Sequence, residues 1–358
     1  MADSTQPSDI DDWAVVDVFC GVGGLTHGFR RVGFNVSAGI DVDHTCKHAF
    51  EANNDARFVG KSIDAVSGSA LARLYPKGKR RILIGCAPCA PFSAYTPEAK
   101  KRRTDKWGLV DIFADRILSV QPEIVSMENV PRLASFDKGR VIKRFIDRLE
   151  AEYKVSTTVV DCSKYGVPQR RCRFVLLASR LGPLELEPPG AEEGKRPTVR
   201  RAIGEMPAIC HGEAHSGDRL HAAPRLSARN LKRIRASEPG GSWEDWPKDL
   251  VAACHKKASG RWYRNVYGRM EWDEPAHTIT TGCFSFGRGR FGHPSQDRAI
   301  SLREAAILQT FPAGYEFVGE EDPVYFDTVG RQIGNAVPVA LAEAIARSIA
   351  KHIEKDRH

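Results

Sequence analysis

Cys89 is the residue in this sequence that is best placed to act as a nucleophile. It lies in the segment GCAPCAPFS, where two prolines restrict the backbone on either side of the thiol. A cysteine on a stiff loop directly after an apolar run presents its thiol to a substrate. The other cysteines nearby, Cys20, Cys46 and Cys86, are interpreted as small buried side chains.

A carboxylate, Glu128, could work beside this thiol. It begins the tripeptide ENV and follows the apolar run Ile124–Met127. A carboxyl group at the end of an apolar strand is desolvated unless it has a partner, which allows it to hold or donate a proton. A lone Glu-Asn pair could also simply form a turn. A nucleophilic thiol and a proton donor together suit a reaction in which a poorly reactive ring carbon is activated by covalent addition.

A third feature, the segment DVFCGVGGLTHGF, is typical of a turn that binds a nucleoside. Gly21, Gly23 and Gly24 carry no Cβ, so their backbone amides can approach a ligand closely. About twenty residues later Asp41 ends the next expected strand, where a carboxylate can accept hydrogen bonds from ribose hydroxyls. The glycines alone would also fit an ordinary tight turn, but with Asp41 they favour a nucleoside cofactor.

These groups can act together only if the fold brings them to the same edge of a β-sheet. The chain from residue 13 to about 179 has the pattern of strand-helix-strand units on a parallel sheet. The expected strands are Ala14–Phe19, Val36–Ile40, Arg81–Gly85, Glu123–Met127, Val155–Val160 and Phe174–Ala178. Apolar side chains between them recur at helical spacing. The sequence therefore predicts a doubly wound, Rossmann-like α/β fold. Its glycine turn, Asp41, Cys89 and Glu128 would all follow the carboxyl ends of strands, where open parallel sheets bind ligands.

The composition changes after Leu181, where a stretch rich in proline and glycine predicts a linker. We expect one domain formed by residues 1–185 with 328–358, and a smaller, loop-rich domain over residues 190–325. The last segment returns to a helical pattern, in which Leu341, Ile345 and Ile349 form an apolar stripe that must pack against a surface.

Bulk properties favour an intracellular protein with an anionic partner. The formal net charge is +8, which suits a polyanion such as nucleic acid. The nine cysteines are odd in number and no secretory leader is evident, so we expect reduced thiols, a cytoplasmic location and no membrane contact. Cysteines and histidines at 210, 215, 254 and 255 form no pair with zinc-ligand spacing, so no metal site is expected.

The motifs, in their order, resemble the DNA cytosine-5 methyltransferase family of the bacterial or phage modification type. Besides the three segments above, QRRCR (Gln169–Arg173), SLREAAILQTFP (Ser301–Pro312) and QIGNAVP (Gln332–Pro338) are similar to later family motifs. The stretch from about 210 to 263 matches none of them. It lies where the family has its variable target-recognition region. The resemblance implies S-adenosylmethionine as the cofactor and duplex DNA as the substrate.

The resemblance also implies roles for individual residues. Cys89 would add to carbon 6 of a cytosine and Glu128 would hydrogen-bond or protonate ring nitrogen 3, while Arg171 and Arg173 would lie near the base and its phosphate. The residues expected around the cofactor are Phe19, Gly21, Gly23, Gly24, Asp41, Ser62, Ile63, Pro88, Asn335 and Val337.

Carbon 6 is inaccessible inside a duplex, so this chemistry requires the cytosine to be rotated out of the helix. Basic and polar residues would hold the opened DNA. The residues expected to contact DNA are Ser93, Lys100, Lys101, Arg102, Arg103, Gln169, Arg233, Lys256 and Arg261.

Three positions depart from the family pattern. Ala90 stands where glutamine usually follows the cysteine, Ser62 stands where an acidic residue is usual with Asp64 two positions later, and Asp41 is one methylene shorter than the usual glutamate. Ala90 and Ser62 leave open a DNA-binding relative with impaired turnover. The same chemistry could also serve an RNA cytosine. The leading interpretation is a monomeric DNA (cytosine-5-)-methyltransferase specific for a short duplex sequence, with a cognate restriction endonuclease as a functional partner rather than a subunit.

Overall fold

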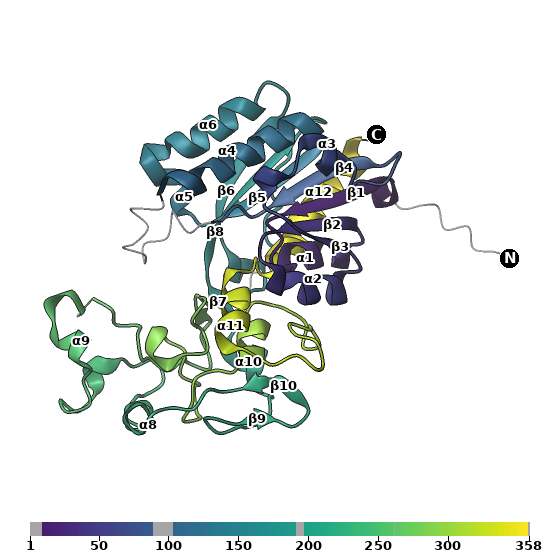
Figure 1. Ribbon diagram of the computed structural model, residues 1–358. Coiled ribbons are helices and arrows are strands. Elements are labelled where there is room, and N and C mark those ends of the chain that lie inside the picture. The colour runs from purple at the N-terminus through teal and green to yellow at the C-terminus, as the bar shows by residue number, and fades with distance from the viewer. Residues whose placement is uncertain (1–8, 89–102, 191–196, 261, 357–358) are drawn as a thin grey trace. The chain divides into compact units, whose positions relative to one another are not determined.

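The computed structural model describes residues 9–88, 103–190, 197–260 and 262–356 (Figure 1). Contacts divide the chain into two units. The first unit contains Met1–Tyr165, Cys172–Ala191 and Val337–His358, and the second contains Gly166–Arg171 and Glu192–Ala336. The two units are described separately below.

The first unit is built on a seven-stranded sheet in the order β3-β2-β1-β4-β5-β8-β6. Its strands are β1 Trp13–Val18, β2 Asn35–Asp41, β3 Arg57–Gly60, β4 Arg80–Gly85, β5 Ile124–Asn129, β6 Lys154–Asp161 and β8 Cys172–Ser179. β1 to β5 are parallel, as the sequence predicted. β8, however, runs antiparallel to both β5 and β6, so the expectation of an entirely parallel sheet was wrong. An apolar run predicts a buried strand, but it does not encode the strand's direction.

Helices cover both faces of this sheet (Figure 1). They are α1 Gly24–Val32, α2 Lys47–Asn54, α3 Gly68–Ala72, α4 Arg103–Val120, α5 Arg132–Ser135, α6 Arg140–Leu149 and α12 Val339–Asp356. α3, α4 and α6 share one buried apolar cluster with the strands. α12 packs closely against α1 and its stripe of Leu341, Ile345 and Ile349 is fully buried, which confirms the expected role of the last helix.

The second unit has little regular structure. Its strands are β7 Gln169–Arg170, β9 Ala214–His215, β10 Asp218–Ala222 and β11 Ala276–His277, and its α-helices are α7 Val199–Ile203, α8 Ala228–Arg235, α9 Ala253–Lys256, α10 Leu302–Leu308 and α11 Phe326–Asn335. With few strands to pair, polar groups hold much of it together. Arg298 and Glu304 are both fully buried and form a bidentate ion pair, with N–O distances of 2.6 and 2.7 Å. Ser301 caps α10 and donates its backbone N–H to the same carboxylate.

A smaller aromatic core lies in the region that the sequence left unassigned. Trp243, Trp246 and Phe286 pack with Ile234. The Trp243 ring stacks on His255 with centroids 4.4 Å apart. This stretch therefore shares a small core with later residues of the second unit, Phe286 and Ala299.

One helical segment of the described chain, Phe326–Asp356, is long and apolar enough to meet a membrane-span criterion. Burial covers 78% of its apolar window, as in the core helices of soluble proteins.

Candidate active site

The glycine turn after β1 needs a backbone that most residues avoid. Phe19 has φ 63°, Gly21 has φ 51° and Gly23, which precedes α1, has φ 88°. Glycine adopts such left-handed angles without a steric penalty, which explains two of these three positions. The Gly23 N–H donates to Cys20 O at 2.9 Å and closes the turn. Gly24 is the buried first residue of α1.

Asp41 fastens this turn to the end of β2. Its Oδ2 accepts the Gly21 N–H at 2.8 Å, and its Oδ1 accepts the Asp43 N–H at 2.8 Å. Burial raises the pKa of Asp41, and the two backbone donors oppose that rise. Because each carboxylate oxygen can accept a second hydrogen bond, Asp41 can still receive hydroxyl donors from a ligand. The next side chain, Val42, is 66% exposed and offers an apolar surface at the same edge that sequence reasoning missed.

Ser62 and Ile63 open the short 3-10 helix Ile63–Ala65 after β3. Ile63 is buried and Ser62 is half-buried. A hydrogen bond from the Ser62 side chain lowers the pKa of Asp64, which is exposed. Asp64, which stands two positions after the place where the family has an acidic residue, therefore contacts Ser62, the residue that occupies that place.

Glu128 lies near the end of β5 and is only 2% exposed. Arg173, on β8, brings its Nε to 2.7 Å from Glu128 Oε1. The N–H bond does not point along this line, so the contact is an ion pair, and no hydrogen bond is aligned on Oε1 among the described residues. The Cys86 thiol donates to Oε2 at 2.9 Å. The structure thus places Arg173 beside the predicted proton donor.

The next residue on β5, Asn129, ties the same edge to the segment that leads to Cys89. Its side-chain amide donates to Ala87 O at 2.9 Å. Pro88, half-buried, is the last described residue before a gap. Cys89, Ser93, Lys100, Lys101 and Arg102 lie outside the described residues, as does Arg261. Arg103 begins α4, but its side chain is not described.

Three residues predicted to contact base or DNA have side chains that are buried within the second unit. Arg171 is 2% exposed and its guanidinium donates to Ile279 O at 2.8 Å. The Gln169 side chain is fully buried and donates to Leu308 O at 2.8 Å. Arg233 donates to Leu250 O at 2.8 Å and lies over the aromatic core. In this structure the three side chains bond to the fold that carries the site.

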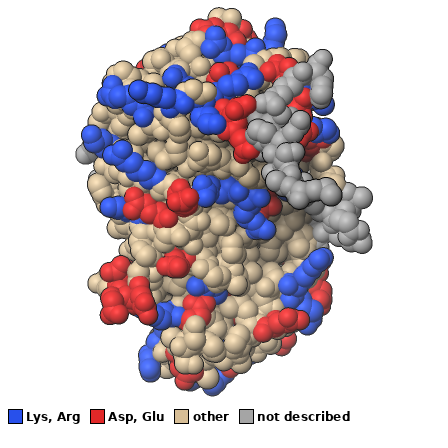
Figure 2. All heavy atoms as spheres, turned by 90° about the vertical axis from the view of Figure 1, so that its right-hand side faces the viewer, with Lys and Arg blue, Asp and Glu red and all other residues tan. Residues whose placement is uncertain are grey.

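Other predicted positions are accessible. Lys256 is exposed, and so is Asn335 at the end of α11. Val337, by contrast, is buried in the first unit. Trp262 is 87% exposed, which is unusual for so large an apolar side chain. On the face in Figure 2, basic and acidic side chains are interspersed, so the positive charge there is not gathered in one patch.

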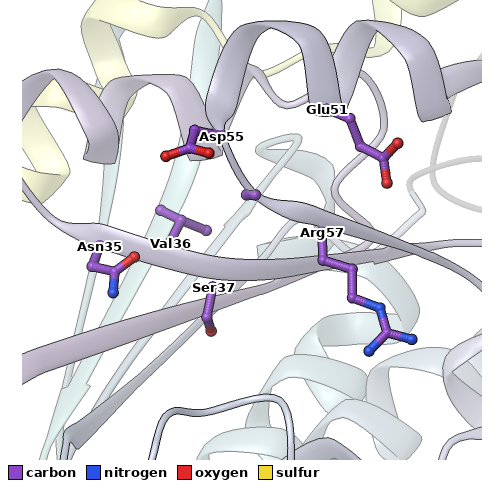
Figure 3. A pocket seen from close by; sticks show the side chains of 7 residues that line it. Asn35, Val36, Ser37, Glu51, Asp55 and Arg57 are labelled. Atoms are coloured by element: carbon purple, nitrogen blue, oxygen red, sulfur yellow. The ribbon is translucent and has the colours of Figure 1, made fainter.

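A surface hollow at the other end of β2 is unrelated to this site. It is lined by Asn35–Ser37, Glu51 and Asp55–Arg57 (Figure 3). These residues begin β2 and β3, whereas Asp41 ends β2, so the hollow lies at the opposite edge of the sheet. Within the described ranges, no group of three or more His, Cys, Asp or Glu side chains could hold a metal ion.

Comparison with known proteins shows which family the chain resembles. The model of the C-5 cytosine-specific DNA methylase family matches residues 13–351. The chain is 54% identical to the Type II methylase M.HgiDII of Herpetosiphon aurantiacus, over 95% of this chain and 96% of that protein. It is 30% identical to the Type II methyltransferase M1.HphI of Haemophilus parahaemolyticus, over 94% and 86%.

Solved structures agree in fold. A prophage-encoded protein of E. coli, described as a DNA modification methyltransferase, superposes with a TM-score of 0.74 at 20% identity, over 95% of this chain and 99% of that one. The Entamoeba histolytica methyltransferase EhMeth gives 0.62 at 15% identity, over 99% and 100%. The family match and the relatives confirm the prediction from sequence: the chain belongs to the C-5 cytosine-specific DNA methylase family.

Proposed function

We propose that this DNA (cytosine-5-)-methyltransferase modifies one cytosine within a specific short duplex sequence, through a covalent Cys89 adduct to a base rotated out of the helix. The observation that supports it most directly is the arrangement around Glu128. The buried Glu128 carboxylate lies at the sheet edge with Arg173 Nε at 2.7 Å. The next residue, Asn129, donates a hydrogen bond to Ala87 O in the segment that leads to Cys89. The part of Cys89 itself rests on the sequence.

Family members use S-adenosylmethionine, and the first unit fits this molecule. The left-handed glycine turn presents backbone amides without a Cβ in the way, and Asp41 can accept the ribose hydroxyls. Exposed Val42 suits the flat face of a purine. When bound, the cofactor supplies an electrophilic methyl group. Phe19, Ser62, Ile63, Pro88, Asn335 and Val337 are proposed to complete its site.

The chain's own residues would prepare the cytosine for this methyl group. The Cys89 thiolate forms a bond to carbon 6 while Glu128 donates a proton to ring nitrogen 3, which makes carbon 5 nucleophilic. After carbon 5 is methylated, its proton leaves, and the Cys89 sulfur departs from carbon 6 with the electrons of that bond. Arg173 compensates the negative charge that Glu128 carries once its proton has passed to the ring.

The second unit is proposed to recognise the DNA sequence, with residues 210–263 as its variable part. Lys256 and Trp262 are exposed in that region and can contact phosphate and base. Because relatives bear Type II methylase names, a cognate restriction endonuclease is proposed as a functional partner. We propose a monomer that works in the cytoplasm.

Duplex DNA containing 5-fluorocytosine tests the covalent mechanism, because fluorine at carbon 5 cannot leave as the proton does. With the cofactor present, the protein should form an adduct that survives denaturation, and Cys89→Ser should abolish it. The substrate should be a library of random duplexes, since the site is unknown. Bisulfite sequencing of DNA from expressing cells would show whether one short sequence is modified. Methylation without any trapped adduct would refute the role of Cys89.

A further inference from the structure

Cys86 is half-buried, not fully buried as the sequence predicted, and it makes a contact that an apolar filler would not make. The sequence analysis interpreted it as a small apolar filler, but its Sγ lies 2.9 Å from Glu128 Oε2 and donates to it. Thiols are weak donors to neutral groups, and a carboxylate is a much stronger acceptor than a carbonyl. The distance is short for a sulfur donor.

The backbone holds this thiol in place. Gly85, the last residue of β4, pairs with Met127 on β5, one residue before Glu128. The Cys86 N–H donates to Val18 O at 3.3 Å, so the residue is also attached to β1. With the Asn129 bond to Ala87 O, two consecutive residues after β4 are bonded to two consecutive residues at the end of β5. The thiol is therefore fixed against the carboxylate.

The two oxygens of Glu128 are consequently in different environments. Oε2 accepts a hydrogen bond from the Cys86 thiol, whereas Oε1 lies beside Arg173 with no hydrogen bond aligned on it among the described residues. A buried oxygen with an open lone pair is the one able to share a proton with a ligand. A half-turn of the carboxylate about its last bond merely exchanges two equivalent oxygens, but a smaller rotation would move one of them away from Arg173, and the bond from the thiol opposes such a rotation.

We propose that Cys86 is a positioning residue for Glu128: its thiol holds Oε2, so that Oε1 is the oxygen that exchanges a proton with the cytosine ring. This inference rests on the proposed function of Glu128. It assigns Cys86 no contact with the substrate. If the thiol only filled space, its replacement by alanine would leave the methyl-transfer rate unchanged.

Infrared spectroscopy tests the contact without any turnover. The S–H stretch of Cys86 is isolated as the difference between the wild-type protein and Cys86→Ser. A thiol bonded to a carboxylate should absorb at a lower frequency than a free thiol. In Glu128→Gln, compared with the Cys86→Ser/Glu128→Gln double variant, the band should move to a higher frequency because an amide oxygen is a weaker acceptor. A band that does not move would overturn the proposal.

Single-turnover methyl transfer tests the consequence. Cys86→Ala should lower the rate constant by about 3- to 10-fold, the value of one ordinary hydrogen bond, while the Kd values for the cofactor and the duplex stay unchanged. Cys86→Ser keeps a donor and should retain most of the rate. In a Glu128→Gln background, Cys86→Ala should cause no further loss. Cys162→Ala, which removes a thiol elsewhere in the first unit, is the control and should keep the wild-type rate.

The outcomes separate this inference from the proposed function. If Glu128→Gln keeps the full rate while the S–H band still shifts, the role of Glu128 is wrong and the contact is merely structural. If Glu128→Gln loses the rate but Cys86→Ala keeps it, only the positioning role fails.

Discussion

Asp17 is a carboxyl group whose protonation is governed by its burial. Asp17, on β1, is fully buried and accepts the Thr26 hydroxyl at 2.7 Å, while Asp41 adds a negative charge nearby. Burial raises the pKa of Asp17 to about 8, even though the Thr26 bond opposes the rise. Asp17 is therefore largely protonated at neutral pH.

The raised pKa makes stability depend on pH. Since the folded state binds the Asp17 proton more tightly than the unfolded state, its contribution is fully present below 3.8 and is lost as the pH rises towards about 8. Asp17→Asn removes this loss. We expect the variant to exceed the unfolding free energy of the wild type only modestly near pH 5, where little of the contribution is lost, and by on the order of a few kcal/mol at pH 9. Thermal unfolding at both pH values measures the difference.

Asp55→Asn is the matched control for this comparison, because that side chain is 94% exposed and the same substitution there should leave the pH dependence unchanged. An Asp17→Asn protein less stable than the wild type at pH 9 would show that Asp17 is needed in its charged form.

At the scale of elements, the packing of α1 on α12 depends on the absence of one side chain. A Cβ added to Gly28 would lie 2.4 Å from Ala342 Cβ and 2.7 Å from the Glu343 backbone nitrogen. Backbone cannot move aside as a flexible side chain can, so the helices would have to separate. Gly28→Ala should lower the unfolding free energy by about 1–3 kcal/mol, as measured by urea denaturation.

Gly108 provides a control of the same type. It also lies within a helix, α4, but a Cβ there meets no atom within 4 Å. Gly108→Ala should stabilise the protein by roughly 0.5–1 kcal/mol, because alanine is the better helix former. Equal effects at both positions would mean that helix propensity, rather than the contact with α12, governs Gly28.

Sequence patterns predicted the elements better than the contacts. Five of the six expected strands are largely buried apolar runs, and the exposed β6 was found because it is rich in β-branched residues. β3 was missed because RFVG is short and half-polar. The glycine turn and Glu128 lie at the expected sheet edge. Arg171 and Arg233, however, read as exposed cations in the sequence and are buried on backbone carbonyls in the structure. Periodicity cannot reveal which way an arginine in an irregular segment points.

At the scale of the whole molecule, the formal net charge of +8 should strengthen DNA binding, but only through Lys and Arg side chains that are exposed to solvent. Lys256 is exposed, whereas the Arg233 guanidinium lies over Trp246 and Tyr267 at 5.5 and 5.2 Å and donates to Asn230 Oδ1 at 3.0 Å. These two cations, 23 positions apart in one region of the sequence, should therefore respond differently to the loss of charge.

Lys256→Gln should weaken binding to unrelated duplexes about equally and reduce the slope of log K against log salt by about 1, because one phosphate contact is lost. Arg233→Gln should leave that slope unchanged and lower the unfolding free energy by about 1–3 kcal/mol, because buried carbonyls lose their donors. Fluorescence anisotropy at several salt concentrations and thermal unfolding measure the two effects. If Arg233→Gln altered the salt slope at unchanged stability, the second unit would have to open on DNA and expose its arginine core, and the interior that holds the fold together would itself be part of the binding surface.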